Sequence, residues 1–172
     1  KVADQMHFAW VNGTPSNESF DYTGATAGAA TVSAATKTLM EQNKRGLWVD
    51  LGGGTDDIVG SPYGDNFNIV ASDSGIEYLD GGDNLGTSPS GQNAKDYLDI
   101  FVANEAEGKT ISVVKLPATS TNSTESDAIG KLYTHKVLKG TATIAFIKNI
   151  ERVSVQQWTD TNSDGQRQWG SE

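Results

Sequence analysis

Short segments in which apolar and polar residues alternate make up most of this chain. The clearest of them are rich in β-branched and aromatic residues and span 6–11, 47–51, 97–103, 110–116, 132–138 and 141–155. Such alternation is typical of half-buried strands, and clusters of Gly, Asn, Ser and Thr separate the segments as turns do. The last segment is long enough for two strands or one bent strand. The pattern predicts a mainly β fold, either a mostly antiparallel β-sandwich or a related two-sheet fold, with little helix.

One segment, 34–45, has the composition of a helix, and its Leu39 and Met40 are expected to cover one end of the core. The polar run 118–127 is predicted to be an exposed loop. A chain of 172 residues suits one domain of ordinary size, spanning 1–172. It begins at Lys1 rather than Met, so we expect it to be a fragment of a larger protein, with this domain as a monomeric module.

The overall charge excludes several classes of partner. The chain has 13 Lys and Arg against 22 Asp and Glu, a net charge of −9, so its surface repels phosphate and we expect no nucleic-acid partner. There is no Cys, which excludes disulfides, a thiol nucleophile and Cys-ligated metal. No apolar stretch approaches the roughly 20 residues of a membrane helix, so we expect no membrane insertion.

The acidic residues are concentrated in one Gly-rich segment. Nine Asp lie between positions 50 and 99, together with ten Gly and a single basic residue, Lys95. Carboxylates this close repel one another unless something offsets their charge. A bound divalent cation would do so, and short oxygen ligands on Gly-rich turns suit calcium. A solvated acidic loop, or adaptation to salty surroundings, is the alternative.

The same segment contains a nine-residue period. Asp56 and Asp65 lie nine apart, and each is followed two residues later by a large apolar residue, Ile58 and Phe67. The pattern recurs out of register at Leu79 and again around Leu98. A ten-residue insertion around 85–95 separates these last two units.

The period resembles the glycine-rich nonapeptide of RTX (repeats-in-toxin) proteins, G-G-x-G-x-D-x-U-x, in which U is a large apolar residue. The matching pieces are GTDDIVGSPYGDNFN (54–68) and YLDGGDN…DYLDIF (78–101), so the resemblance covers about 50–101. In that motif Gly permits the tight turn, Asp supplies a carboxylate to a shared calcium, and U points into the core. With so few units, we expect the segment to be a calcium-dependent flange on a flanking β-sandwich.

Several calcium ions are therefore expected, held by carboxylates and turn carbonyls. The candidate ligands are Asp50, Gly53, Asp56, Asp57, Asp65, Asp80, Gly82, Asp83, Asp96 and Asp99. Near the end of the chain, Asp160, Asn162 and Asp164 precede Gly165 in the pattern of a D-x-N-x-D-G calcium loop. Position twelve of an EF-hand would be Ser171 rather than Glu, and no entering helix is evident, so we predict a single loop or a simple Asx-rich turn.

A compact β domain with an interrupted repeat is similar to the peptide-binding, or ligand-binding, domains of large bacterial RTX adhesins. The resemblance implies a secreted module on the bacterial cell surface, active in cell adhesion and biofilms. Such a module holds the C-terminal residues and carboxylate of a partner protein on another cell, aided by bound Ca²⁺. An open calcium beside the insert would allow an acidic protein to bind that anion. The expected ligand contacts are Tyr63, Asp83, Asn84, Asn93 and Asp96; an idle surface loop is the alternative.

Three other functions remain open at the sequence level. A calcium-dependent carbohydrate-binding module (a lectin) would use the ion to bridge sugar hydroxyls, and a structural spacer would bind calcium alone. A polysaccharide lyase or hydrolase is the least favoured, because neither His7 nor His135 can be assigned a nucleophile and no zinc spacing occurs. We therefore expect no enzyme activity.

Overall fold

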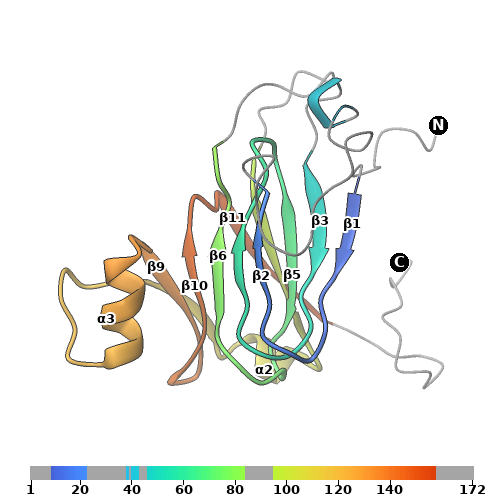
Figure 1. Ribbon diagram of the computed structural model, residues 1–172. Helices are drawn as coiled ribbons and strands as arrows, with labels where there is room; N and C mark the ends of the chain where they lie inside the picture. The colour runs from blue at the N-terminus through green and yellow to red at the C-terminus, as the bar shows by residue number, and fades with distance from the viewer. Residues whose placement is uncertain (1–8, 23–37, 39, 43–45, 84–94, 158–172) are drawn as a thin grey trace.

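The computed structural model describes residues 9–22, 38, 40–42, 46–83 and 95–157. Within these residues the chain forms two β-sheets that lie face to face (Figure 1). The five-stranded sheet contains, in order, β1 (Ala9–Asn12), β3 (Leu47–Asp50), β5 (Asn66–Val70), β7 (Tyr97–Val102) and β11 (Arg152–Gln157). The six-stranded sheet contains β2 (Ser19–Asp21), β4 (Asp57–Val59), β6 (Glu77–Asp80), β10 (Ala142–Lys148), β9 (His135–Lys139) and β8 (Ile111–Lys115).

From β1 to β7 successive strands lie in alternate sheets, so the chain winds as a coil. Pairing is parallel throughout the five-stranded sheet. It is also parallel from β2 to β10 in the other sheet, and only the additions of β9 and β8 are antiparallel. The nine-residue period corresponds to half a turn of this coil: one strand and the turn that follows it. Successive units therefore build two sheets of parallel strands joined by turns at both ends.

The large apolar residues of the repeat form the interior of the coil. Val49, Phe67 and Leu98 are in register across the five-stranded sheet, and Ile58, Leu79 and Ile147 are in register across the other. All six are at most 4% exposed and belong to one hydrophobic cluster. Burying a side chain of this size stabilises the fold by about 1.5–3 kcal/mol relative to its exposure.

A second, smaller core lies on the outer face of the six-stranded sheet. Helix α3 (Ser123–Gly130) lies beside this sheet, next to β9 and β10 (Figure 1). Its Ala128 packs with Tyr78 of β6 and Phe146 of β10. The short helix α2 (Glu105–Gly108) follows β7 at the lower end of the coil in Figure 1. Both helices begin at an Asn cap whose side chain accepts a backbone N–H.

The prediction of a mainly β fold with two sheets and little helix is confirmed. The mostly antiparallel pairing was wrong, since alternation along a strand does not distinguish parallel from antiparallel neighbours. The repeat segment is also not a flange: it supplies β4 to β7 at the centre of both sheets. The segment 141–155 divides into β10 and β11, because Asn149 turns the chain with a positive φ of 54°.

Helical structure differs from the sequence-based expectation in one segment and agrees with it in another. The run 118–127 was expected to be a loop, but helix α3 starts within it at Ser123. In the predicted helix 34–45, residues 38 and 40–42 are helical and Met40 is buried in the main core, as expected. The rest of that segment, Leu39 included, lies outside the described residues.

Candidate functional site

Acidic side chains are stacked at the lower end of the coil, one per turn. Glu18, Asp56 and Glu77 each immediately precede or open a strand of the six-stranded sheet and are in register with one another. The backbone N–H of Glu18 donates to Asp56 Oδ1 at 2.9 Å, and the N–H of Asp56 donates to Glu77 Oε2 at 3.0 Å. We call these three residues the first ladder.

A second ladder occupies the opposite end of the coil and consists of Asp65, Asp96 and Glu151. The N–H of Asp65 donates to Asp96 Oδ1 at 2.7 Å, and the N–H of Asp96 donates to Glu151 Oε2 at 2.6 Å. Asp65 in turn accepts the N–H of Leu47 at 2.5 Å. Asp56, Glu77, Asp65, Asp96 and Glu151 therefore each link their own turn to the turn before it, whereas the carboxylate of Glu18 accepts from Thr14 within its own turn.

Burial opposes the charge of these carboxylates. Asp65 and Asp96 are fully buried, and Asp56 and Glu77 are nearly so. Desolvation raises the pKa of Asp65 to about 8, although the N–H groups of Leu47 and Ser61 oppose the rise. Desolvation and then the neighbouring Asp56 raise the pKa of Glu77 to about 8, and the pKa of Asp56 rises to about 6. A proton or a bound cation would offset this cost.

Glycines let the turns approach the ladder carboxylates closely. A Cβ added at Gly60 would lie 2.4 Å from Asp65 Oδ2, and one at Gly81 would lie 2.5 Å from Asp96 Oδ2. The Gly-rich turns therefore wrap around the carboxylates, as a turn supplying carbonyl oxygens to the same ligand must. Asp56 Oδ2 is buried without a hydrogen-bond partner, which leaves one ladder oxygen available to a cation.

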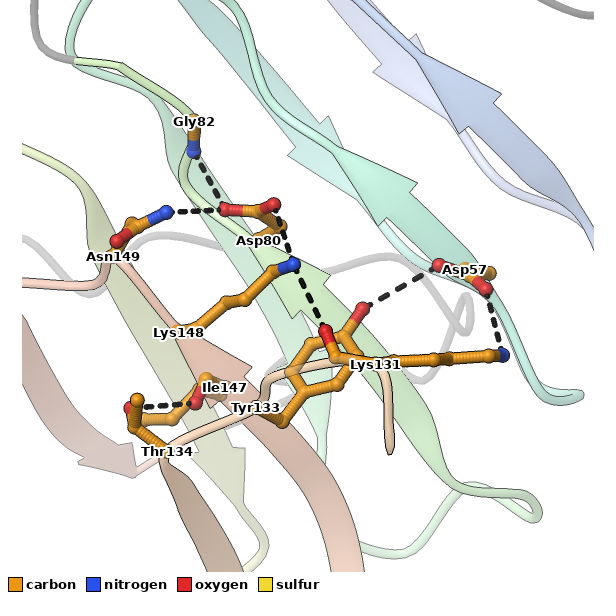
Figure 2. A network of polar contacts seen from close by, with 9 residues as sticks. All are labelled: Asp57, Asp80, Gly82, Lys131, Tyr133, Thr134, Ile147, Lys148 and Asn149. Atoms are coloured by element: carbon orange, nitrogen blue, oxygen red, sulfur yellow. Dashed lines mark hydrogen bonds and ion pairs between the residues drawn. The ribbon is translucent and has the colours of Figure 1, made fainter. Parts of the chain in front are cut away.

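Two of the predicted ligands instead have lysine partners (Figure 2). Lys131 Nζ lies 3.2 Å from Asp57 Oδ2, and Lys148 Nζ lies 3.0 Å from Asp80 Oδ2. Asp80 Oδ1 also accepts from Asn149 Nδ2 at 2.8 Å and from the N–H of Gly82. The lysines come from the later part of the chain, so some of the charge that the sequence left unbalanced is offset by distant residues rather than by metal.

The remaining predicted ligands are spread over the coil. Gly53 lies in the turn between β3 and β4, and Gly82 and the exposed Asp83 follow β6. Asp50 ends β3 and Asp99 lies within β7, both in the five-stranded sheet. Asp160, Asn162 and Asp164 lie outside the described residues.

The predicted peptide contacts do not form one exposed surface. Tyr63 is 8% exposed and Asp96 is fully buried, whereas Asp83 is exposed. Asn84, Asn93 and nearly all of the insert 85–95 lie outside the described residues. Of the five residues, Asp83 is thus the one that the structure places where a peptide could reach it.

Sequence reasoning missed Glu18, Glu77 and Glu151, which complete the two ladders. The available signal was positional: Glu77 stands two residues before Leu79 just as Asp56 stands two before Ile58. Glu was not considered because the repeat motif specifies Asp at this position. Ser61 was also missed; its N–H and Oγ both donate to Asp65, at 2.6 and 2.8 Å.

No group of three or more His, Asp or Glu side chains gathers around one point within the described ranges. The carboxylates are stacked along the coil instead, so a calcium ion at a ladder would need carbonyl oxygens of the turns as further ligands. Of the helices that the structure describes, none is long and apolar enough to cross a membrane.

Comparison with family models, with curated proteins and with solved structures finds no match to this chain.

Proposed function

We propose that this chain is a calcium-stabilised coil module of an RTX-type adhesin, which binds the C-terminal residues and carboxylate of a protein on another cell. The observation that carries the calcium part is the pair of carboxylate ladders at the Gly-rich turns, in which Asp56, Glu77, Asp65 and Asp96 are buried. In an acidic chain, buried carboxylates stacked at successive turns are sites where a divalent cation lowers the energy of the folded state.

The residues present fit a hard cation in their donor chemistry. They offer carboxylate oxygens, turn carbonyls brought close by Gly60 and Gly81, and the partnerless Oδ2 of Asp56. Calcium, when bound, would supply positive charge that keeps the ladder carboxylates ionised. The chain's own part is to hold successive turns in register, through the N–H bonds that each ladder carboxylate accepts.

The adhesive part of the proposal follows from the resemblance and from the position of Asp83. This exposed carboxylate follows Gly82, which has a positive φ of 83°, at the end of the coil that carries the second ladder. Tyr63 and Asp96 are buried next to the same turns and would position the site rather than touch a peptide. A calcium held partly by Asp83 would give an acidic surface a local positive charge for a terminal carboxylate.

The test is isothermal titration with a short peptide carrying either a free or an amidated C-terminus, in calcium and in EGTA. We expect binding of the free-carboxylate peptide only, and only in calcium. Asp83→Ala should weaken this binding at least tenfold, while Asp73→Ala, an exposed Asp in a turn at the other end of the coil, should leave it unchanged. Equal binding of both peptides, or binding that EGTA does not alter, would contradict the proposal.

A further inference from the structure

A row of polar residues crosses the outer face of the five-stranded sheet. Asn12, Asp50, Asn68, Asp99 and Ser154 occupy equivalent positions on β1, β3, β5, β7 and β11. Phe67 and Ile69 on either side of Asn68 belong to the interior of the coil. Because successive side chains alternate across a strand, the row faces away from that interior. We call it the polar row; it lies on a sheet face, whereas the ladders lie in the turns at the ends of the coil.

Asn68, in the middle of the polar row, is a buried amide without partners. It is fully buried, and neither its Oδ1 nor its Nδ2 forms a hydrogen bond. The adjacent Asn66 is 7% exposed, and its Oδ1 is also without a partner. Leaving a buried amide unsatisfied destabilises the folded state, so two amide oxygens in this state on one strand point to a missing positive or donating group.

The neighbouring carboxylate, Asp99, has no compensating charge among the described residues. Asp99 is 9% exposed, and it accepts hydrogen bonds from Ser154 Oγ and from Asn66 Nδ2, the latter at 3.2 Å. Both donors are neutral, and no Lys or Arg of the described segments forms an ion pair with Asp99. A carboxylate buried to this degree normally has a cationic partner or a metal.

The spacing of the strands suits an ion between neighbouring members of the row. Paired strands lie about 4.7–4.9 Å apart, and oxygens stacked in register have a similar separation. Calcium binds oxygen at about 2.3–2.6 Å, so an ion midway between two stacked oxygens is at bonding distance from both. An Asn that gives its oxygen to the ion keeps its amide N–H₂ free to donate to a stacked carboxylate.

We propose that the polar row holds a divalent cation of the calcium class between neighbouring strands β5 and β7, with Asn68 and Asp99 as its protein ligands. This site is separate from the ladders and does not depend on the adhesive function. Asn66, which donates to Asp99, is a positioning residue with an oxygen available as a further ligand. Trp48 and Tyr97 flank Asn66 in register on the same face, so a luminescent metal bound here would have aromatic donors close by.

The experiment compares Asn68→Leu with wild type and with Asp65→Asn in the second ladder. Calcium stoichiometry is measured by titration calorimetry on the full chain, and terbium binding by luminescence excited through Trp. We expect Asn68→Leu to bind one calcium fewer than wild type and to lose most of the sensitised terbium emission. Trp48→Phe should lower that emission without lowering the calcium stoichiometry.

Thermal melts supply a second readout. In EDTA, Asn68→Leu should melt at or above the wild-type temperature, because a near-isosteric apolar side chain replaces an unsatisfied amide. In calcium the same variant should melt below wild type, since it lacks one stabilising ion. A purely structural role for Asn68 predicts a loss of stability in both conditions, which would overturn the proposal.

Calcium stoichiometry distinguishes failure of the polar-row site from failure of the ladder sites. An unchanged calcium stoichiometry in Asn68→Leu overturns the site on the polar row, whatever Asp65→Asn does. If Asn68→Leu loses one ion while Asp65→Asn loses none, the polar row binds calcium and the ladder containing Asp65 does not. Wild-type protein that binds no calcium refutes both.

Discussion

Asp65 and Asp96 are 31 positions apart in the chain, yet the backbone N–H of Asp65 donates to Asp96 Oδ1 at 2.7 Å. This bond joins the turn after β4 to the turn after β6, and Glu151 extends the same arrangement to the turn after β10. The equivalent bonds at the other end of the coil join Glu18, Asp56 and Glu77. The acidic residues of the two ladders therefore hydrogen-bond successive turns to one another.

The ladders should respond to calcium more than other acidic positions do. Asp56→Ala and Asp96→Ala each remove the acceptor of a backbone N–H, at a cost of about 1–3 kcal/mol, and also remove a proposed calcium ligand. We expect each to reduce the calcium-induced rise in Tm by at least half. Asp127→Ala, which removes an exposed partner of Lys131 on α3, should leave the rise unchanged. Differential scanning calorimetry with and without calcium measures this, and an equal response at all three positions would place the metal elsewhere.

The calcium-free protein should lose stability as the pH rises. The pKa values of Asp65 and Glu77 are raised to about 8 and that of Asp56 to about 6, while in the unfolded chain these groups ionise near their ordinary values of 3.8 and 4.5. Between these limits the folded state binds more protons than the unfolded state, so the free energy of unfolding falls with increasing pH. Urea unfolding in EDTA from pH 4.5 to 8 measures the slope.

Two controls accompany that measurement. Asp65→Asn cannot ionise and should flatten the pH dependence of the free energy of unfolding. Calcium should flatten it as well, because the ion favours the charged form of the ladder carboxylates. A calcium-free protein that becomes more stable over this pH range would contradict the burial argument.

Gly75 should tolerate no side chain. Its φ is +110°, and an added Cβ would lie 1.4 Å from the carbonyl oxygen of Gly54 in the neighbouring turn. The backbone conformation alone costs a non-Gly residue about 1–3 kcal/mol, and the overlap adds to this. We expect Gly75→Ala to lower the free energy of unfolding by at least that amount in chemical denaturation. Gly130→Ala, in helix α3 with no atom near the added Cβ, should instead stabilise the protein by up to about 1 kcal/mol.

Replacing Leu132 with glycine should stabilise the protein. The N–H of Leu132 donates to Ile129 O and that of Tyr133 to Ala128 O, which is the Schellman ending of a helix, here of α3. Leu132 adopts a φ of 66° at the position where Gly is usual, and its side chain is 75% exposed. Leu132→Gly should raise the free energy of unfolding by roughly 1 kcal/mol, since it relieves left-handed strain and gives up little burial. Leu132→Ala retains the strain and should be neutral within error in the same denaturation series.

The sequence predicted the class of fold and the interior residues better than it predicted strand pairing. Ile58, Phe67 and Leu98 were identified as inward-pointing from the nine-residue period, and all three are in the main core. Parallel pairing was missed because the polar and apolar alternation of a half-buried strand is the same in both arrangements. The better signal was that Val49 extends the period backwards from Ile58, which predicts two parallel sheets built by one winding chain.

The candidate site was predicted only in part, because the repeat identifies residues near in sequence and not partners that the fold brings together. Asp56, Asp65 and Asp96 were found from the repeat, and all three are ladder members. The lysine partners of Asp57 and Asp80 could not be found, because Lys131 and Lys148 reach them only through the fold. The burial of Asn68 could not be predicted from the sequence either, because an Asn in a strand is normally expected at the surface.

The parallel pairing of β6 with β10 has a consequence for how the chain folds. During synthesis on the ribosome, five elements are made between β6 and β10, from β7 to β9. The edge of β6 that pairs with β10 therefore stays unpaired while they are made. Tyr78 on the same strand likewise lacks its ring contact with Phe146 until β10 is made. A pairing formed this late between distant segments slows folding, and it leaves an unpaired strand edge that another chain can pair with. A nascent chain arrested before residue 142 should therefore be the species most prone to aggregate and the one that most needs a chaperone.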